Sequence, residues 1–446
     1  MTSPQGPRHP PAYQLWNWAH RPFEYMEDLE RRFGETFRLH FAGIRPFVLF
    51  SNPEHIREIF SADPEELYAG ESNAVMKPFL GAHSLLMLDG AEHLRQRRLV
   101  LGPLHGERMQ QYGEQMAQLT HEAIDRWPLG TPFPIHPSFQ ATTLGIILRT
   151  VFGFDTGERL DAFSEAVTDF IDSGSTPALL FRPLRVDLGR WSPWGRFRRA
   201  VERVDTLFYA EIHRRRAEGV GRRADVLSLL MEARDEAGTP LSDVELRDQL
   251  LTLLITGHET TATALAWFWH WVLKDEALHT ALREEARAAT SPAERGARLP
   301  LLEATLRETL RLQPVIPTLG RVLQRPMRIG GYDLPAGTRI MASIYLTHRR
   351  PSLYPEPERF LPQRFLDVRP SPWEWIPFGG GTRRCVGMAF ALYEMKVVLA
   401  TILSRTLLRR PPGPPVKVVR RGITLSTSQG MPVLLEERRA GAEVGT

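Results

Sequence analysis

The sequence contains a single cysteine, Cys385, among its 446 residues. One cysteine excludes an internal disulfide framework, a multi-cysteine zinc site and an iron–sulfur cluster held by this chain alone. Three interpretations of Cys385 stay open: a buried inert thiol, a nucleophile, or a lone thiolate that binds a metal.

Long hydrophobic runs and an excess of charge are also missing. No stretch reaches the roughly 18 apolar residues of a membrane span, and the proline-rich start lacks the apolar segment of a secretory signal. The net charge is only +4, which is weak evidence for a nucleic-acid partner. We therefore expect a cytoplasmic protein with no membrane span and no nucleic-acid partner. Hydrophobic residues make up 42% and charged residues 24%, which is ordinary globular usage.

The spacing of apolar residues predicts a mainly α protein with a small β portion. Apolar residues recur every three or four positions from Glu92 to about Arg287, as in amphipathic helices. Short β-rich runs separated by Pro and Gly predict strands elsewhere. The expected organisation is a lead-in and first helix over 1–34 and one domain over 35–446, with a β-rich lobe (35–60 and 314–346), an α-rich lobe (90–313 and 386–408) and a last hairpin near Ile423–Leu435.

The most informative stretch surrounds the cysteine. Three glycines, 379–381, precede Cys385, and a helix is expected from about Val386 to Arg405. Glycines allow a tight turn, and the start of a helix stabilises a thiolate. A lone thiolate held in this way suits the axial iron ligand of a haem. A phosphate-binding loop is rejected because Gly-Lys-Ser/Thr does not follow, and a structural cysteine is the alternative.

The same residues carry a resemblance to a known family. Phe378, Gly381, Cys385 and Gly387 match the signature F-x-x-G-x-x-x-C-x-G of the cytochrome P-450 haem-thiolate monooxygenases. The resemblance runs from about Glu35 to Pro432 and implies the cytochrome P-450 fold, with a long central helix across the haem. It also implies haem b as cofactor, with Cys385 as the axial ligand of its iron.

A second stretch lies in a long predicted helix that begins with the capping box of Ser242 and Glu245. The zinc motif H-E-x-x-H is rejected at His258 because position 262 is alanine. The segment Gly257–Thr260 resembles the family's (A/G)-G-x-(D/E)-T pattern. That resemblance implies that Thr260 and Glu259 deliver protons to oxygen at the haem. Thr256 departs from the usual Ala or Gly of the pattern.

Several charged residues acquire roles through the resemblance. Glu308 and Arg311 match the family's E-x-x-R motif, and Arg364 lies in its P-x-R-F partner stretch, which implies a structural ion network. Alone, the first two residues would be read as a solvated helix pair. Four further residues match positions that bind the haem propionates: His93, Arg97, Arg321 and Arg383.

Substrate contacts and partners are implied by the family as well. The positions that would line a substrate pocket are mostly apolar, which favours a lipophilic substrate. They are Val75, Met76, Phe79, Leu80, Leu179, Leu180, Phe181, Leu253, Thr256, Val315, Ile316 and Leu319. Arg45 lies where some fatty-acid hydroxylases of the family anchor a carboxylate, but an exposed turn arginine is the more common case.

The expected activity is insertion of one oxygen atom from O2 into an unactivated C–H bond of a fatty acid, terpenoid, steroid or polyketide. Electrons would come from a separate ferredoxin or flavodoxin with its NAD(P)H reductase, as in the soluble bacterial members of the family. Two alternatives stay open: a peroxide-using peroxygenase or haem isomerase, and a haem-binding protein that is not an enzyme. The acid–alcohol pair argues against the first alternative.

Overall fold

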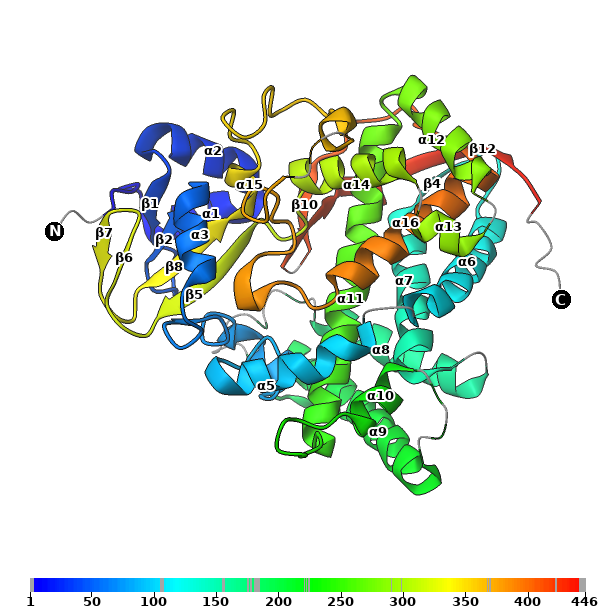
Figure 1. Cartoon of the computed structure of the whole chain (residues 1–446), viewed down its shortest axis with the longest axis horizontal. Helices are drawn as coiled ribbons and strands as arrows, with labels where there is room; N and C mark the ends of the chain where they lie inside the picture. The colour runs from blue at the N-terminus through cyan, green and yellow to red at the C-terminus, as the bar shows by residue number, and fades with distance from the viewer. Residues whose placement is uncertain are drawn as a thin grey trace.

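The protein is described by a computed structural model in which helices predominate and strands form small sheets (Figure 1). The mainly α class with a small β portion, expected from the sequence, is thereby confirmed. The structure describes residues 4–104, 108–154, 157–174, 176, 179, 185–219, 221, 223, 225–289, 291–297, 299–366, 368, 370–421 and 423–440.

The α-helices among these residues are α1 (Pro11–His20), α2 (Pro22–Phe33), α3 (Pro53–Ser61), α4 (Lys77–Leu80), α5 (Gly90–Leu101), α6 (Arg108–Arg126), α7 (His136–Phe152), α8 (Glu158–Gly174), α9 (Pro193–Glu218), α10 (Val226–Glu232), α11 (Asp243–Val272), α12 (Glu276–Ala288), α13 (Pro292–Ala297), α14 (Pro300–Leu312), α15 (Ile344–Thr347) and α16 (Met388–Arg405). The strands are β1 (Thr36–Leu39), β2 (Phe47–Phe50), β3 (Leu67–Tyr68), β4 (Pro132–Pro134), β5 (Thr318–Leu323), β6 (Met327–Ile329), β7 (Tyr332–Leu334), β8 (Arg339–Ser343), β9 (Thr406–Arg409), β10 (Val418–Arg421), β11 (Thr424–Thr427) and β12 (Pro432–Arg438).

Local signals fix the ends of several helices. Pro22 opens α2 at a position where a missing N–H costs nothing. The Asn52 side chain accepts the N–H of Glu54 at the start of α3. The central helix α11 starts with the predicted capping box, in which the side chains of Ser242 and Glu245 each bond the other's backbone N–H.

The chain divides into a β-rich part and a larger helical part on either side of the middle of the molecule (Figure 1). The largest sheet has the order β1-β2-β8-β5-β3, so that strands from both ends of the expected β-rich lobe lie in one sheet. The long helix α11 runs through the centre of the view, with α16 crossing in front of it. The side chains of Phe268 and Trp269 on α11 are buried in the main hydrophobic core, and that of Trp267 is buried as well.

The last hairpin differs from the expectation. The hairpin is formed by β10 and β11, which pair antiparallel over Val418–Thr427. Strand β12 does not return to β11; it pairs with β9 and β4 instead. The expected hairpin near Ile423–Leu435 was therefore wrong, because β12 finds its partners in segments that are distant in sequence and leave no local signal.

A buried ion network holds the C-terminal end of α14. Glu308 and Arg311 are fully buried, and the Nε and Nη2 atoms of Arg311 donate to the two Glu308 carboxylate oxygens at 2.7 and 2.9 Å. Arg364 adds a third charge, with Nε 3.1 Å from Glu308 Oε1. All lone pairs and N–H groups of such a cluster need partners, because a buried charge without one is costly.

The network is connected to the segment that carries the cysteine. Arg311 Nη1 donates to the carbonyl of His348 at 2.7 Å. The His348 ring accepts the backbone N–H of Ile376 on Nε2 at 2.9 Å, two residues before Phe378. The pKa of His348 is lowered to about 3 by its burial and by the charge of Arg311, so this ring stays neutral and keeps Nε2 as an acceptor.

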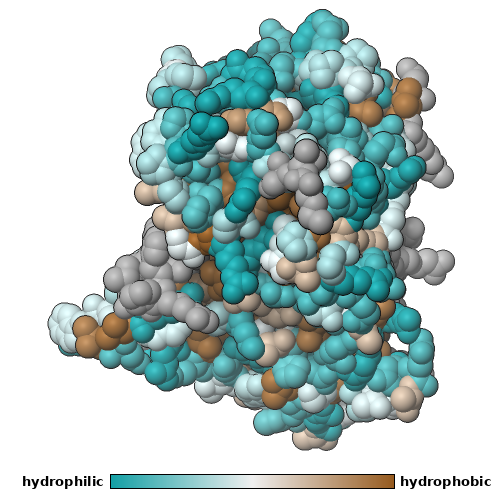
Figure 2. Space-filling model, turned by 90° about the vertical axis from the view of Figure 1, so that its left-hand side faces the viewer, coloured by the Kyte–Doolittle hydropathy of each residue, from teal (hydrophilic) through white to brown (hydrophobic). Residues whose placement is uncertain are grey.

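The surface is mostly hydrophilic. Figure 2 shows small hydrophobic patches among hydrophilic side chains, several of them recessed near the middle of this face. No helix of the described residues combines the length and the apolar composition that a bilayer crossing requires.

Removing the Glu308 carboxylate tests the buried network. Glu308→Ala leaves Arg311 buried without its counter-charge, so we expect the free energy of unfolding to fall by about 3–5 kcal/mol. Glu303→Ala on the same helix is the matched control, because Glu303 pairs with Arg307 and Lys396 near the surface. That change should cost less than about 1 kcal/mol. Equal losses in chemical denaturation would contradict the structural role of the network.

Candidate active site

The segment before α16 folds into a tight turn that presents Cys385. The backbone N–H of Cys385 donates to the carbonyl of Phe378 at 2.9 Å and closes the turn. Gly379 and Gly381 have positive φ angles of 70° and 63°, which only glycine adopts readily. A Cβ at Gly381 would also lie 1.9 Å from the carbonyl oxygen of Phe60, so the turn packs against the end of α3.

The Cys385 side chain is accessible although it lies deep in the protein. Its residue is exposed, yet burial raises the pKa of its thiol, and the Gly387 N–H, Arg97 and Arg384 lower it. The thiol therefore faces an open space inside the fold rather than bulk water. Gly387 has open space where a Cβ would be. Binding to a metal would deprotonate the thiol outright.

Four basic side chains meet next to this space. His93 and Arg97 lie one turn apart on α5, as their spacing predicts. Arg321 comes from β5, and Arg383 from the turn before the cysteine. His93 is only 1% exposed, and its pKa is lowered to about 3 by burial and by the charges of Arg383, Arg97 and Arg321. The structure thus brings together all four residues that were expected to bind propionates.

The charges in this cluster are not balanced by the protein. Burial, together with the charge of a neighbouring arginine, lowers the pKa of both Arg321 and Arg383 to about 10. Among the described residues, the one carboxylate in salt-bridge contact with an arginine of this cluster is that of Asp89, and its partner is Arg383. The described part of the chain therefore offers no carboxylate partner to the charges of Arg97 and Arg321. The buried Nδ1 of His93 has no hydrogen-bond partner there either.

Arg383 differs from the other members of the cluster. Its Nη2 lies 2.5 Å from Asp89 Oδ1, and its guanidinium also donates to the carbonyls of Leu85 and Leu88. Asp89 in turn accepts the backbone N–H groups of Gly70 and Glu71. Arg383 thus ties the cysteine turn to the loop before α5, and the loop supplies most of its acceptors.

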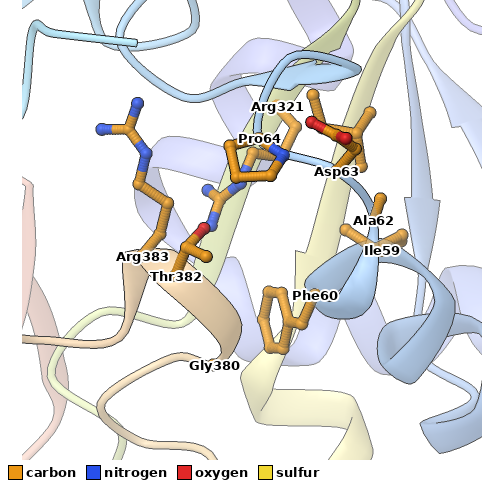
Figure 3. A pocket seen from close by; sticks show the side chains of 10 residues that line it. Ile59, Phe60, Ala62, Asp63, Pro64, Arg321, Gly380, Thr382 and Arg383 are labelled. Carbon is orange, nitrogen blue, oxygen red and sulfur yellow. The ribbon is translucent and has the colours of Figure 1, made fainter. Parts of the chain in front are cut away.

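The guanidinium of Arg321 is more available. Its Nη1 donates to the carbonyl of its neighbour Gly320 at 2.8 Å, and no carboxylate of the described residues lies within salt-bridge distance. Figure 3 shows the pocket that Arg321 and Arg383 line together with Thr382. Two positive charges without a carboxylate partner, next to an accessible thiol, fit a cofactor that carries two negative charges and a metal. Haem b is such a cofactor, because it has two propionates and an iron.

The oxygen-side stretch lies in the middle of α11, which continues through it without a break. The hydroxyls of Thr256, Thr260 and Thr261 donate to backbone carbonyls four residues earlier, at 2.7 to 2.8 Å. Gly257 allows close packing on α7, because a Cβ there would lie 3.3 Å from Ile147 Cδ1.

Glu259 and Thr260 do not interact with each other. The Glu259 carboxylate turns toward α7, where Gln140 Nε2 donates to its Oε2 at 2.6 Å. No hydrogen bond between Glu259 and Thr260 occurs in the described part of the chain. Successive residues of a helix point about 100° apart, so one side chain can face α7 while the next faces another direction.

The expected substrate positions differ in exposure. Met76, Phe79, Thr256, Ile316 and Leu319 are partly buried, as expected of side chains that face an interior space. Leu80, Leu179, Leu253 and Val315 are buried, whereas Val75 is exposed. Leu180 and Phe181 lie outside the described residues. Arg45 is exposed in the turn between β1 and β2.

Sequence reasoning missed Asp89, Gln140 and His136. Asp89 directly precedes α5, where an acidic residue is a common helix start signal; that signal does not reveal its partner Arg383. Gln140 and His136 lie more than a hundred residues from Glu259 and carry no local signal of their contact with it.

Comparisons with known proteins agree with this geometry. The cytochrome P450 family model matches residues 4–431. The chain belongs to the cytochrome P450 family. It is 38% identical over 412 residues to a protein designated cytochrome P450 135B1 of Mycobacterium tuberculosis, with 91% of this chain and 85% of the relative covered. It is 37% identical to cytochrome P450 135A1 of the same species, with 98% and 96% covered.

Solved structures show the same fold. The retinoic acid-bound cyanobacterial CYP120A1 superimposes with a TM-score of 0.84 at 24% identity, covering 98% of this chain and all of the other. The haem domain of cytochrome P450DA has the same TM-score and identity, with 98% of both chains covered. The protein is thus a P450 monooxygenase, and the family implies haem b as its cofactor.

Removal of one unmatched arginine tests the fit of the cluster to the propionates. A hydrogen bond to a charged group contributes about 1.5–3 kcal/mol, so Arg321→Gln should speed haem transfer to apomyoglobin roughly tenfold to a hundredfold. Arg325→Gln is the control, because Arg325 is exposed beyond the end of β5 and pairs with Glu66. Identical transfer rates in both variants would remove Arg321 from the propionate site.

Proposed function

We propose that this P450 inserts one oxygen atom of O2 into an unactivated C–H bond of a lipophilic small molecule. Fatty acids, terpenoids, steroids and polyketides are the substrate types that fit. The observation that carries the reaction class is the accessible Cys385 thiol beside two unmatched buried positive charges. The largely apolar set of expected substrate positions supports a lipophilic substrate.

The cofactor would be held from two sides. Cys385 would bind the haem iron as a thiolate, and the nearby charges of Arg97 and Arg384 favour that form. His93, Arg97 and Arg321 would bind the propionates, with Arg383 at the edge because Asp89 already engages it. When bound, haem with a thiolate ligand supplies the cleavage of the O–O bond.

The residues of α11 would handle protons. Thr260 Oγ1 would hold a proton on the side of the helix that faces the cofactor, and Glu259 would supply it from a carboxyl group. Such placed acids contribute about 10²–10⁴-fold to a reaction that needs proton transfer.

Electrons would come from a separate cytoplasmic ferredoxin or flavodoxin and its NAD(P)H reductase. The exposed Arg384 next to Cys385 supports docking of an acidic partner. Glu308, Arg311 and Arg364 would act as structural residues that brace the cysteine segment.

Turnover under ¹⁸O2 tests the proposed reaction. With ferredoxin, its reductase and NADPH, and with a lipophilic compound that changes the haem spin state, we expect a product that carries one ¹⁸O atom. A product formed only with peroxide would identify a peroxygenase. Absence of any product with every spin-shifting compound would support a haem-binding protein that is not an enzyme.

Replacement of the alcohol tests proton handling. Thr260→Ala should lower product formation about tenfold or more and divert electrons to hydrogen peroxide. Thr261→Ala removes the neighbouring hydroxyl, which is buried and donates to the carbonyl of Gly257, and serves as the control. Product per NADPH should stay close to the native value in the control. Equal diversion in both variants would exclude a specific role for Thr260.

A further inference from the structure

The carboxylate of Glu259 lies in a small polar cluster between α11 and α7. Gln140 Nε2 donates to Glu259 Oε2 at 2.6 Å. Thr263 Oγ1 lies 3.5 Å from Glu259 Oε1 and 3.4 Å from His136 Nε2. The same His136 nitrogen is 3.9 Å from Glu259 Oε1. Three side chains therefore lie around the Glu259 carboxylate. The Thr260 hydroxyl is not one of them, because it donates to the carbonyl of Thr256.

Gln140 and Thr263 donate hydrogen bonds to Glu259, and His136 lies within hydrogen-bond distance of Thr263. His136 is fully buried, and its pKa is lowered to about 4 by burial and by the charges of Arg421 and His258. Its ring is thus neutral and carries one proton. The Nδ1 atom is buried without a partner among the described residues, so the proton is favoured on Nε2, which faces Thr263 and Glu259, because a bare buried N–H is costly.

The packing of α7 against α11 does not require this arrangement. The interface between α7 and α11 has another polar contact, from Thr143 Oγ1 to the carbonyl of His258 at 3.1 Å. An apolar pair at positions 140 and 259 would pack two helices as well. A partly accessible carboxylate with a strong charge-assisted donor instead points to control of its position.

We propose that Gln140 and His136 are positioning residues that hold the Glu259 carboxylate at α7 and thereby set the place from which it hands a proton to Thr260. The inference rests on the proposed role of Glu259 as proton donor. As the side chain turns, the Glu259 carboxyl gives its proton to the Thr260 oxygen while the Thr260 hydroxyl passes its own proton on to the reacting oxygen. The carboxylate then takes up a proton from solvent and returns to Gln140.

The experiment compares two single changes in the same helix interface of the haem-loaded enzyme. Gln140→Met keeps the length of the side chain but removes the donor to Glu259. Thr143→Val removes the other polar contact and leaves Glu259 untouched. We expect Gln140→Met to lower kcat about tenfold, to leave KM within about twofold, and to raise the share of electrons released as hydrogen peroxide. Thr143→Val should match the native enzyme in all three.

An infrared measurement gives a readout that does not depend on turnover. The carboxylate band of Glu259 is identified as the band that Glu259→Gln removes. A shift of this band is expected in Gln140→Met and not in Thr143→Val, because only the first change removes a hydrogen bond to that carboxylate. If Gln140→Met does not load haem, the nearly isosteric Thr263→Val replaces it and should shift the band less in the same direction.

The outcomes separate this inference from the function on which it rests. If Glu259→Gln leaves peroxide release and product formation unchanged, Glu259 is not the proton donor and the proposed function of that residue fails. If Glu259→Gln diverts electrons while Gln140→Met resembles Thr143→Val in kcat and in the infrared band, the positioning role of the α7 cluster is wrong and the proton role of Glu259 stands.

Discussion

The site depends on one constraint, which is that it buries more arginine side chains than carboxylates and so holds unbalanced positive charge. Arg97, Arg321 and Arg383 approach one another beside Cys385, and Asp89 matches only one of them. A folded chain accepts such a cluster when a ligand supplies the missing negative charge. In the proposed site, the two propionates of haem b supply that charge.

The remaining framework keeps these groups in place. Glu308, Arg311 and Arg364 fix the end of α14 and, through His348, the backbone just before the cysteine turn. On the other side of the turn, Arg383 and Asp89 tie it to the loop that leads into α5 and His93. The Cys385 thiol and the basic cluster are therefore held by one connected framework.

The sequence predicted those features whose signals are local. The capping box of α11 and the glycine turn before Cys385 both follow from residues a few positions apart, and the structure has them. His93 and Arg97 could be paired from helical spacing alone. That Glu308 and Arg311 belong to a buried network could be predicted only from the family resemblance, because an ion pair on a helix surface has the same spacing.

Features that depend on distant segments could not be predicted. Strand β12 pairs with β4 and β9 rather than with its neighbour β11. The ion pair of Asp89 with Arg383 and the bond from Gln140 to Glu259 join residues more than a hundred positions apart. Adjacent positions in sequence also suggested that Glu259 and Thr260 act side by side, whereas the helix directs their side chains to different neighbours.

The spectrum of the ferrous carbon monoxide complex tests the central claim most directly, namely that Cys385 binds the haem iron as a thiolate. The protein with one haem per chain should show a strongly red-shifted Soret band. In Cys385→Ser the haem content should fall or the red shift should vanish. A native spectrum without the red shift, or a red-shifted band that persists in Cys385→Ser, would contradict the account.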